Sequence, residues 1–410
     1  MKMALSLVYK TVNPKHTSAM ESTNGSRPTP ALLSVAPTKV LAARTSAKWR
    51  EFPADVLPLP VMEMDYEIAL PIREKLIEMI NTSDTGYLGP YPEVGIALAG
   101  FMKKRFNWDL DPENVFTCTD VGVGIIEMAR MIVQPGDGIV YNPPVYHNIG
   151  NWIDELKCQR VSAPLKRNGL HYTLDFDAIE AAYKTGAKIH ILCNPANPVG
   201  TVFTREELSQ LAELAKKYNV AIFSDEIHAP LTYDHKSFIP FLSVSDTARE
   251  VGICVTSASK SWNLAGLKCA EIVTASDRWT AIAKAMPLAV HWRASLYGAA
   301  AATVAFGCID WLDSAVATND RNRRYLKELL DEHLPKVGYR VPDTSYVGWL
   351  DLTALNLGEN PSARLLEEAR VAFNAGFTFG ADHHQFVRLN FGTSQENIAE
   401  AIRRVASIAL

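Results

Sequence analysis

From about residue 113 onward the chain repeats one pattern: a short apolar run, a turn with polar residues or glycine, and then apolar residues at helical spacing. This alternation is typical of a mostly parallel sheet with helices on both faces. The apolar runs that we interpret as strands lie at 114–118, 138–141, 188–193, 220–223, 251–255 and 270–274. The pattern therefore predicts an α/β fold.

Apolar residues at helical spacing predict helices in the segments before, between and after these strands. Helices are expected at about 71–81, from the turn at 120–124 to about 133, near 294–306 and at about 314–333. A further helix begins after Thr204, which together with Glu207 matches the capping-box pattern. Two segments after the last helix, 345–351 and 386–392, predict strands of a second, smaller domain.

The domain organisation follows from these elements. Residues 1–45 are rich in Ser, Thr, Pro and Ala, and we expect much of this segment to be mobile. Residues 86–309 hold the alternating pattern and form the predicted large domain. Residues 46–85 and 310–410 together form the predicted small domain, and prolines at positions 53, 58 and 60 predict an extended path near its start.

Composition and charge narrow the class of protein. The 410 residues are 48% apolar and 21% charged, and the net charge of −4 argues against a nucleic-acid or membrane-surface role. The six cysteines are widely spaced without a CxxC pair, so we expect reduced thiols, no disulfide frame and no metal site. No apolar run approaches the ~18 residues of a membrane span, and the N-terminus lacks a secretory pattern. A cytoplasmic protein is expected.

One lysine follows the predicted strand at 251–255 directly, within the segment TSASKSWNLAGLK of residues 256–268. Lys260 would stand at the carboxyl edge of the sheet, where open α/β sheets bind ligands. An exposed lysine has a pKa of roughly 10.4, so covalent amine chemistry needs burial or a neighbouring cation, such as Lys268, to lower that pKa. From this segment alone, an ordinary surface lysine in a serine-rich loop is the alternative interpretation.

Polar side chains also follow two other predicted strands. Asp225 comes just after the strand at 220–223, where a buried carboxylate is costly unless it meets a cation, either an arginine or the protonated nitrogen of a ligand. His228 lies three residues later, and a histidine there is more often packed than catalytic. Asn197 belongs to a loop with two Asn-Pro pairs, which predicts a rigid loop whose polar groups can meet a ligand.

Three further segments supply candidate ligand contacts. The turn at 120–124 contains Gly122 and opens a helix, so its free N–H groups can hold a phosphate, although many helices begin at glycine without a ligand. Tyr146 follows the strand at 138–141 and can either stack on a planar cofactor or cover the core. Arg388 lies within an apolar strand, where a guanidinium must pair with a protein carboxylate or with that of a ligand.

Taken in this order, the segments resemble those of the fold-type I pyridoxal-phosphate enzymes. The closer resemblance is to their aminotransferase-like carbon–sulfur lyases, the cystathionine β-lyase family that includes MalY and PatB. It extends over about residues 46–408 and is carried by KWR at 48–50, EMD at 63–65, NPPVY at 142–146, SDEIH at 224–228, SASKSWNL at 257–264 and FVRLN at 386–390. The resemblance implies a large domain with a mostly parallel seven-stranded sheet and a smaller α+β domain.

The resemblance also implies a role for each candidate residue. Lys260 would be the catalytic lysine that forms a Schiff base with pyridoxal 5′-phosphate, and Asp225 would pair with the pyridine nitrogen. Asn197 would bond the ring hydroxyl and Tyr146 would stack on the ring, both next to the substrate. Arg388 would bind the substrate α-carboxylate. The other implied cofactor contacts are Val121, Gly122, His228, Ser257, Lys268 and, from the second subunit of a homodimer that shares its active site, Tyr87.

Four places depart from the family pattern. Ala196 stands where a histidine is common, and the segment that begins at His147 replaces a Pro- and Phe-rich continuation. Gly348 replaces a larger residue or alanine next to Trp349, and the pair at 383–384, both histidines, replaces a glycine-rich stretch. We expect these positions, except Ala196, to lie at the substrate pocket or its mouth. The cofactor site is therefore expected to be retained, while the substrate stays open.

The expected reaction is β-elimination from an S-substituted L-cysteine, a small amino acid, which yields a thiol, pyruvate and ammonia. Transamination uses the same residues, as does decarboxylation coupled to oxidative deamination of a cysteine conjugate in secondary metabolism, so both stay open. A regulatory protein that sequesters a transcription factor is the non-enzymatic alternative. The presence of Lys260, Asp225 and Arg388 together argues against a purely non-catalytic protein.

Overall fold

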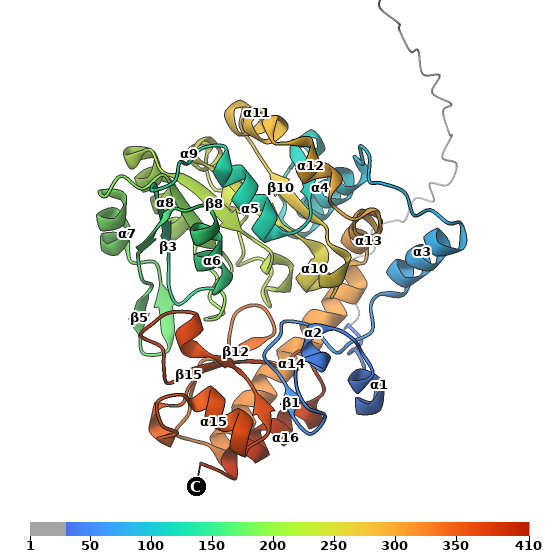
Figure 1. Ribbon diagram of the computed structural model, residues 1–410, viewed down its shortest axis with the longest axis vertical. Helices are drawn as coiled ribbons and strands as arrows, with labels where there is room; N and C mark the ends of the chain where they lie inside the picture. The colour runs from blue at the N-terminus through green and yellow to red at the C-terminus, as the bar shows by residue number, and fades with distance from the viewer. Residues whose placement is uncertain (1–29, 410) are drawn as a thin grey trace, which may run out of the picture.

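The computed structural model describes residues 30–409 (Figure 1). Its largest sheet has seven strands in the order β2-β10-β9-β8-β7-β3-β4. Neighbouring strands are parallel except at β10, which runs antiparallel to β2 and β9. In sheet order the strands are Val115–Cys118, Ala270–Val273, Gly252–Thr256, Ala221–Asp225, Ile189–Cys193, Gly138–Tyr141 and Gln159–Ser162. The expectation of a mostly parallel seven-stranded sheet is confirmed.

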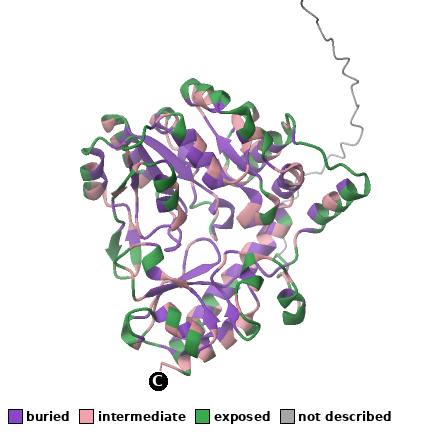
Figure 2. Ribbon diagram, viewed as in Figure 1, coloured by how far each residue is buried: buried purple, intermediate pink, exposed green. Residues whose placement is uncertain are grey.

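Helices cover this sheet on both faces, because successive residues of its buried strands point to opposite sides and both sets are apolar. The helices of one face are α5 (Val121–Arg130), α6 (Asn148–Glu155), α11 (Asp277–Ala285) and α12 (Leu288–Trp292). Those of the other face are α4 (Glu93–Phe106), α7 (Phe176–Tyr183), α8 (Arg205–Tyr218), α9 (Asp246–Val251) and α13 (Leu296–Gly307). Figure 2 shows the buried strands between helices that expose their outer sides.

The start of α8 illustrates how local sequence sets these helices. The Thr204 side chain accepts a hydrogen bond from the N–H of Glu207 at 3.2 Å, and the Glu207 carboxylate accepts one from the N–H of Thr204 at 2.8 Å. Both donors would otherwise lack partners at a helix N-terminus. The predicted capping box is confirmed.

A smaller antiparallel sheet lies beside the large one, in the order β11-β12-β15-β14 (Figure 1). Its strands, in that order, are Gly338–Tyr339, Val347–Asp351, Phe386–Asn390 and Asn374–Ala375. The helices of this part are α14 (Ile309–His333), which leads into it from the large sheet, α15 (Pro361–Glu368) and α16 (Gln395–Ala406). The remaining strands form two short pairs: β1 (Leu57–Pro58) with β13 (Val371–Ala372), and β5 (Lys166–Asn168) with β6 (His171–Thr173).

The N-terminal part of the chain differs from the expected arrangement. Residues 30–45 contain α1 (Thr38–Ala42), with Leu41 buried, whereas residues 1–29 of the segment expected to be mobile lie outside the described residues. α2 (Ala47–Arg50) follows. α3 (Leu70–Asn81), expected in the small domain, packs against α13 of the large sheet. The division into 46–85 with 310–410 and 86–309 stays a prediction.

No single helix among residues 30–409 has both the length and the apolar composition to cross a membrane. α13 and α14 reach that composition only when taken together, and they are bent by 79° relative to each other.

Candidate active site

A cavity of about 540 Å³ opens where β7, β8 and β9 end, with β14, β15 and residues 60–62 on its other side. In open α/β sheets, ligands bind at this carboxyl edge. The structure brings all but one of the predicted site residues to the lining of this cavity: Val121, Gly122, Tyr146, Asn197, Asp225, His228, Ser257, Lys260, Lys268 and Arg388.

Lys260 lies in the short helix α10 (Ala258–Ser261), directly after β9. Its amine lies 3.4 Å from the carbonyl oxygen of Met62. Burial, followed by the positive charge of Arg388, lowers the pKa of Lys260 from 10.5 to about 8. The structure thus rules out an ordinary surface lysine at this position and supplies an amine that is partly neutral near physiological pH.

Asp225 is the last residue of β8 and is 5% exposed. One carboxylate oxygen accepts a hydrogen bond from the N–H of Ile227 at 3.1 Å. Burial raises its pKa to about 6, which the bond from Ile227 and the charge of Lys260 partly oppose. No arginine within residues 30–409 forms an ion pair with this carboxylate. The alternative of a buried Asp–Arg pair is therefore not seen among these residues, and the role of Asp225 toward a ligand nitrogen stays a prediction.

His228 follows Asp225 and lines the same cavity. It is 3% exposed, and its Nδ1 lies 3.4 Å from the hydroxyl of Ser345. Burial, together with the charges of Lys260 and Arg388, lowers the pKa of His228 to about 3. The imidazole is therefore neutral and packed, as expected for most buried histidines.

Arg388 lies in the middle of β15 and is 3% exposed. Its guanidinium donates to three neutral oxygens of the described part of the chain: to Asn197 Oδ1 at 3.0 Å, to Asn374 Oδ1 at 2.7 Å and to the carbonyl of Pro60 at 2.9 Å. The Nε atom has no hydrogen-bond partner among residues 30–409, and the Phe379 ring centroid lies 4.9 Å from the guanidinium carbon. Burial lowers its pKa to about 10, so it stays charged at neutral pH. An arginine held in this way can receive the carboxylate of a ligand.

The N-terminus of α5 forms another wall of the cavity. Asp120 caps this helix by accepting a hydrogen bond from the N–H of Val123 at 2.9 Å, and Lys268 lies 3.3 Å from its other oxygen. A Cβ atom at Gly122 would lie 2.8 Å from the Trp152 ring, so only glycine fits beside that ring. Ser257 donates to the carbonyl of Cys269 at 2.6 Å, which occupies its hydroxyl proton.

Two of the remaining predicted residues contact other side chains in the cavity. The Tyr146 hydroxyl accepts a hydrogen bond from Asn148 at 2.7 Å, and its ring centroid lies 6.0 Å from that of Trp152. Asn197 uses its oxygen for Arg388 and its amide nitrogen for the sulfur of Met62 at 3.7 Å. Tyr87 lies between α3 and α4, 88% exposed, and is not part of the cavity lining of its own chain.

The positions that depart from the family pattern have different surroundings. His147 lines the cavity, as expected, and its pKa is lowered by burial and then by Arg388. The prediction for Gly348 is wrong, because a Cβ there would meet Leu326 and Tyr339 at 3.2 Å rather than the cavity. His383 packs against Trp349 with ring centroids 5.8 Å apart and does not line the cavity, so its place at a mouth stays a prediction.

The cavity residues that the sequence interpretation missed include Asp120, Trp152, Asn374 and Met62. Asp120 carries a recognisable signal, because an aspartate just before a helix is a preferred N-cap. The others carry none. Asn374 reaches the cavity because β14 pairs with β15, and this pairing places it directly opposite Arg388.

Comparison with known proteins identifies the family of this chain. The family model for class I and II aminotransferases matches residues 54–405. A Mycobacterium tuberculosis protein with a provisional assignment as a cystathionine β-lyase is 37% identical over 391 residues, which cover 88% of this chain and 94% of that protein. The cystathionine β-lyase of Corynebacterium glutamicum is 33% identical and covers 90% of this chain and 98% of its own length.

Solved structures show the same fold. A pyridoxal-phosphate-dependent β-cystathionase from Corynebacterium diphtheriae, also provisionally assigned, superimposes with a TM-score of 0.88 at 29% identity, over 92% of this chain and 99% of that one. Cystathionine β-lyase PatB of Bacillus subtilis, 30% identical over 86% of this chain, is a further relative. The chain therefore belongs to the aminotransferase class I and II family, with its fold-type I architecture, and within it to the cystathionine β-lyases related to MalY and PatB.

Proposed function

We propose that this protein is a pyridoxal-phosphate-dependent carbon–sulfur lyase that cleaves an S-substituted L-cysteine to a thiol, pyruvate and ammonia. The observation that carries the proposal is the presence in one cavity of an amine of lowered pKa, Lys260, and a buried guanidinium, Arg388, that has no carboxylate partner within residues 30–409. The lyase relatives favour elimination over the other reactions of the family.

The residues present fit the cofactor. Val121 and Gly122 at the start of α5 line the cavity, where a helix N-terminus favours an anion. Lys268, which pairs with Asp120, lines the same end, so this end suits a phosphate. At the other end Asp225 is buried, has no arginine partner in the described part of the chain, and suits a protonated pyridine nitrogen. When bound, pyridoxal phosphate supplies an acceptor for the electron pair left at the substrate Cα.

The side chains of this chain then divide the remaining work. Arg388 binds the α-carboxylate through charge-assisted hydrogen bonds, which orients the Cα–H bond. Lys260, partly neutral because of its lowered pKa, takes the Cα proton, and the sulfur substituent leaves from Cβ as a thiolate. Asp225 keeps the cofactor nitrogen protonated. Hydrolysis of the three-carbon product gives pyruvate and ammonia.

The proposal includes a homodimer in the cytoplasm. Exposed apolar side chains gather on α3, the following loop and the start of α4, and they include Leu70, Ile77, Ile80, Tyr87 and Ile96. A second subunit packed on this side would bury them and could bring its Tyr87 to the cavity. All six cysteines are free thiols, which suits a reducing compartment.

The test is to incubate the purified holoenzyme with S-methyl-L-cysteine and to measure pyruvate and free thiol. A new amino acid formed from added keto acid would instead indicate transamination, and carbon dioxide with an aldehyde would indicate decarboxylative oxidation. Lys260→Ala should abolish pyruvate formation, whereas Lys336→Ala, which removes an exposed lysine, should not. Wild-type turnover by Lys260→Ala would overturn the proposal.

A further inference from the structure

Residues 60–64 form an irregular strap that follows β1 and lines the cavity with its first three residues. None of the five belongs to a helix or strand, so their carbonyl oxygens must find partners elsewhere. Each of the five carbonyls accepts a hydrogen bond from a side chain. For the carbonyls of Pro60, Val61, Met62, Glu63 and Met64, in this order, the donors are Arg388 at 2.9 Å, Asn390 at 2.7 Å, Tyr346 at 3.0 Å, Lys48 at 3.2 Å and Asn263 at 2.8 Å.

The strap thereby contacts both Arg388, to which we assign substrate binding, and Lys260, to which we assign proton transfer. The Pro60 carbonyl holds one end of the Arg388 guanidinium, and the Met62 carbonyl lies 3.4 Å from the Lys260 amine. The Met62 sulfur also contacts Asn197, which bonds Arg388 in turn. A shift of the strap would move the acceptors of both Lys260 and Arg388 together.

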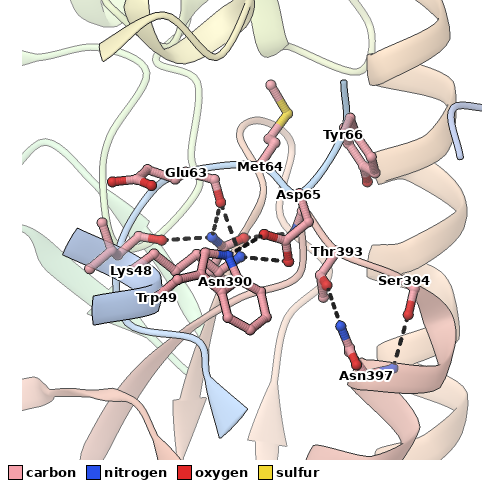
Figure 3. Close-up of polar contacts among 12 residues, drawn as sticks. Lys48, Trp49, Glu63, Met64, Asp65, Tyr66, Asn390, Thr393, Ser394 and Asn397 are labelled. Carbon is pink, nitrogen blue, oxygen red and sulfur yellow. Dashed lines mark hydrogen bonds and ion pairs between the residues drawn. The ribbon is translucent and has the colours of Figure 1, made fainter. Parts of the chain in front are cut away.

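A buried ion pair fixes the end of the strap (Figure 3). The Lys48 amine donates to the Asp65 carboxylate at 2.8 Å and to the Glu63 carbonyl at 3.2 Å, with the two charged side chains 0% and 1% exposed. Trp49 donates to the second Asp65 oxygen at 3.0 Å. Burial lowers the pKa of Lys48, and the Asp65 charge opposes this. Such a pair adds little net stability over an apolar pair, and in some proteins it serves to specify one relative position of the groups that it joins.

We propose that Lys48 and Asp65 are positioning residues that hold the strap, and through its Pro60 and Met62 carbonyls set the positions of Arg388 and Lys260. This inference rests on the proposed function. Its consequence is that a change at Lys48, which lines no part of the cavity, alters both substrate binding and proton transfer.

The test compares Lys48→Met with Lys48→Arg in the holoenzyme. Lys48→Met should lower kcat/KM for S-methyl-L-cysteine by about 10- to 100-fold, the range expected for a misplaced catalytic group. It should also shift the pH midpoint of the visible absorbance of the bound cofactor, a readout that does not depend on turnover. Lys48→Arg, which keeps a charged donor, should retain most of the wild-type kcat/KM and an absorbance midpoint close to that of the wild type.

Two further variants separate positioning from folding. Arg105→Met breaks another largely buried ion pair, with Asp313, and should lower thermal stability without moving the absorbance midpoint. If Lys48→Met does not fold, Lys48→Met/Asp65→Leu removes both charges and should fold with a shifted midpoint. A folded Lys48 variant with an unchanged midpoint and wild-type kcat/KM would overturn the inference. Absence of lyase activity in the wild-type holoenzyme would instead overturn the proposed function.

Discussion

The reactivity of Lys260 toward its cofactor should follow a pKa of about 8 rather than the ordinary lysine value of 10.5. The difference corresponds to about 3 kcal/mol against protonation. At pH 7.5 about a quarter of the Lys260 amines would be neutral, compared with about one in a thousand for a lysine of ordinary pKa. We therefore expect Lys260 to be reactive as an amine before a ligand binds.

The assay is the rate at which protein freed of cofactor captures added pyridoxal phosphate, followed by absorbance between pH 6 and 10. The rate should rise with a midpoint near pH 8. After burial, the Arg388 charge is the largest cause of the lowered pKa of Lys260. Because a neighbouring cation disfavours a protonated amine, Arg388→Met should move the midpoint to higher pH.

Two results would refute this reasoning. A wild-type midpoint near pH 10 would mean that the cavity does not hold Lys260 partly neutral. An unchanged midpoint in Arg388→Met would mean that the guanidinium is not a cause of the lowered pKa. Lys336→Ala serves as the control, since it removes an exposed lysine and should leave the midpoint in place.

Three other predictions follow from the geometry. Asp225→Asn should retain the cofactor on gel filtration but lower pyruvate formation by roughly 100-fold, because the cofactor nitrogen loses its anionic partner. Gly122→Ala should weaken cofactor affinity and destabilise the protein by about 1–3 kcal/mol, because the new Cβ meets Trp152; Gly100→Ala, in α4 with open space around it, should not destabilise. His190, neutral between Tyr183 and Asn142, has its pKa lowered by burial from 6.5 to about 3. Between pH 6.5 and 3 the unfolded chain therefore binds a proton at His190 that the folded chain does not bind. The free energy of unfolding should fall as the pH drops through this range, by about 2 kcal/mol at pH 5. An equal loss of unfolding free energy in urea titrations of wild type and His190→Gln would contradict this.

The large sheet could be predicted because its central strands are buried on both faces. β7, β8 and β9 are continuous apolar runs, and each was located within one or two residues. β4 and the β5–β6 pair were missed because their residues are largely polar and exposed, so no apolar run marks them. α14 begins at Ile309 rather than near the predicted residue 314, directly after the end of the alanine-rich α13 at Gly307.

The candidate site could be predicted where strand order alone brings residues together. Asp225 ends one of three adjacent parallel strands, and Asn197 and Lys260 follow the other two, so their side chains are expected at one edge of the sheet. Gly348 shows the limit of this reasoning. Alternation along β12 predicts that Gly348 and Trp349 lie on opposite faces of the strand. It does not predict that Gly348 lies on the face covered by Leu326 of α14, because that depends on how the helix packs.

The strap could not be found from the sequence for a different reason. Its functional atoms are backbone carbonyls, which every residue carries, so residues 60–64 show no side-chain pattern that marks them as acceptors. In the sequence their donors are ordinary polar residues. The structure shows what Lys48, Asn263 and Asn390 have in common, because each donates a hydrogen bond to a carbonyl of residues 60–64. In our proposal the side chains that the motifs identify supply the chemistry, whereas backbone carbonyls of residues 60–64 set their relative position. Variants at the donors, rather than in the cavity, therefore test how this site is held in place.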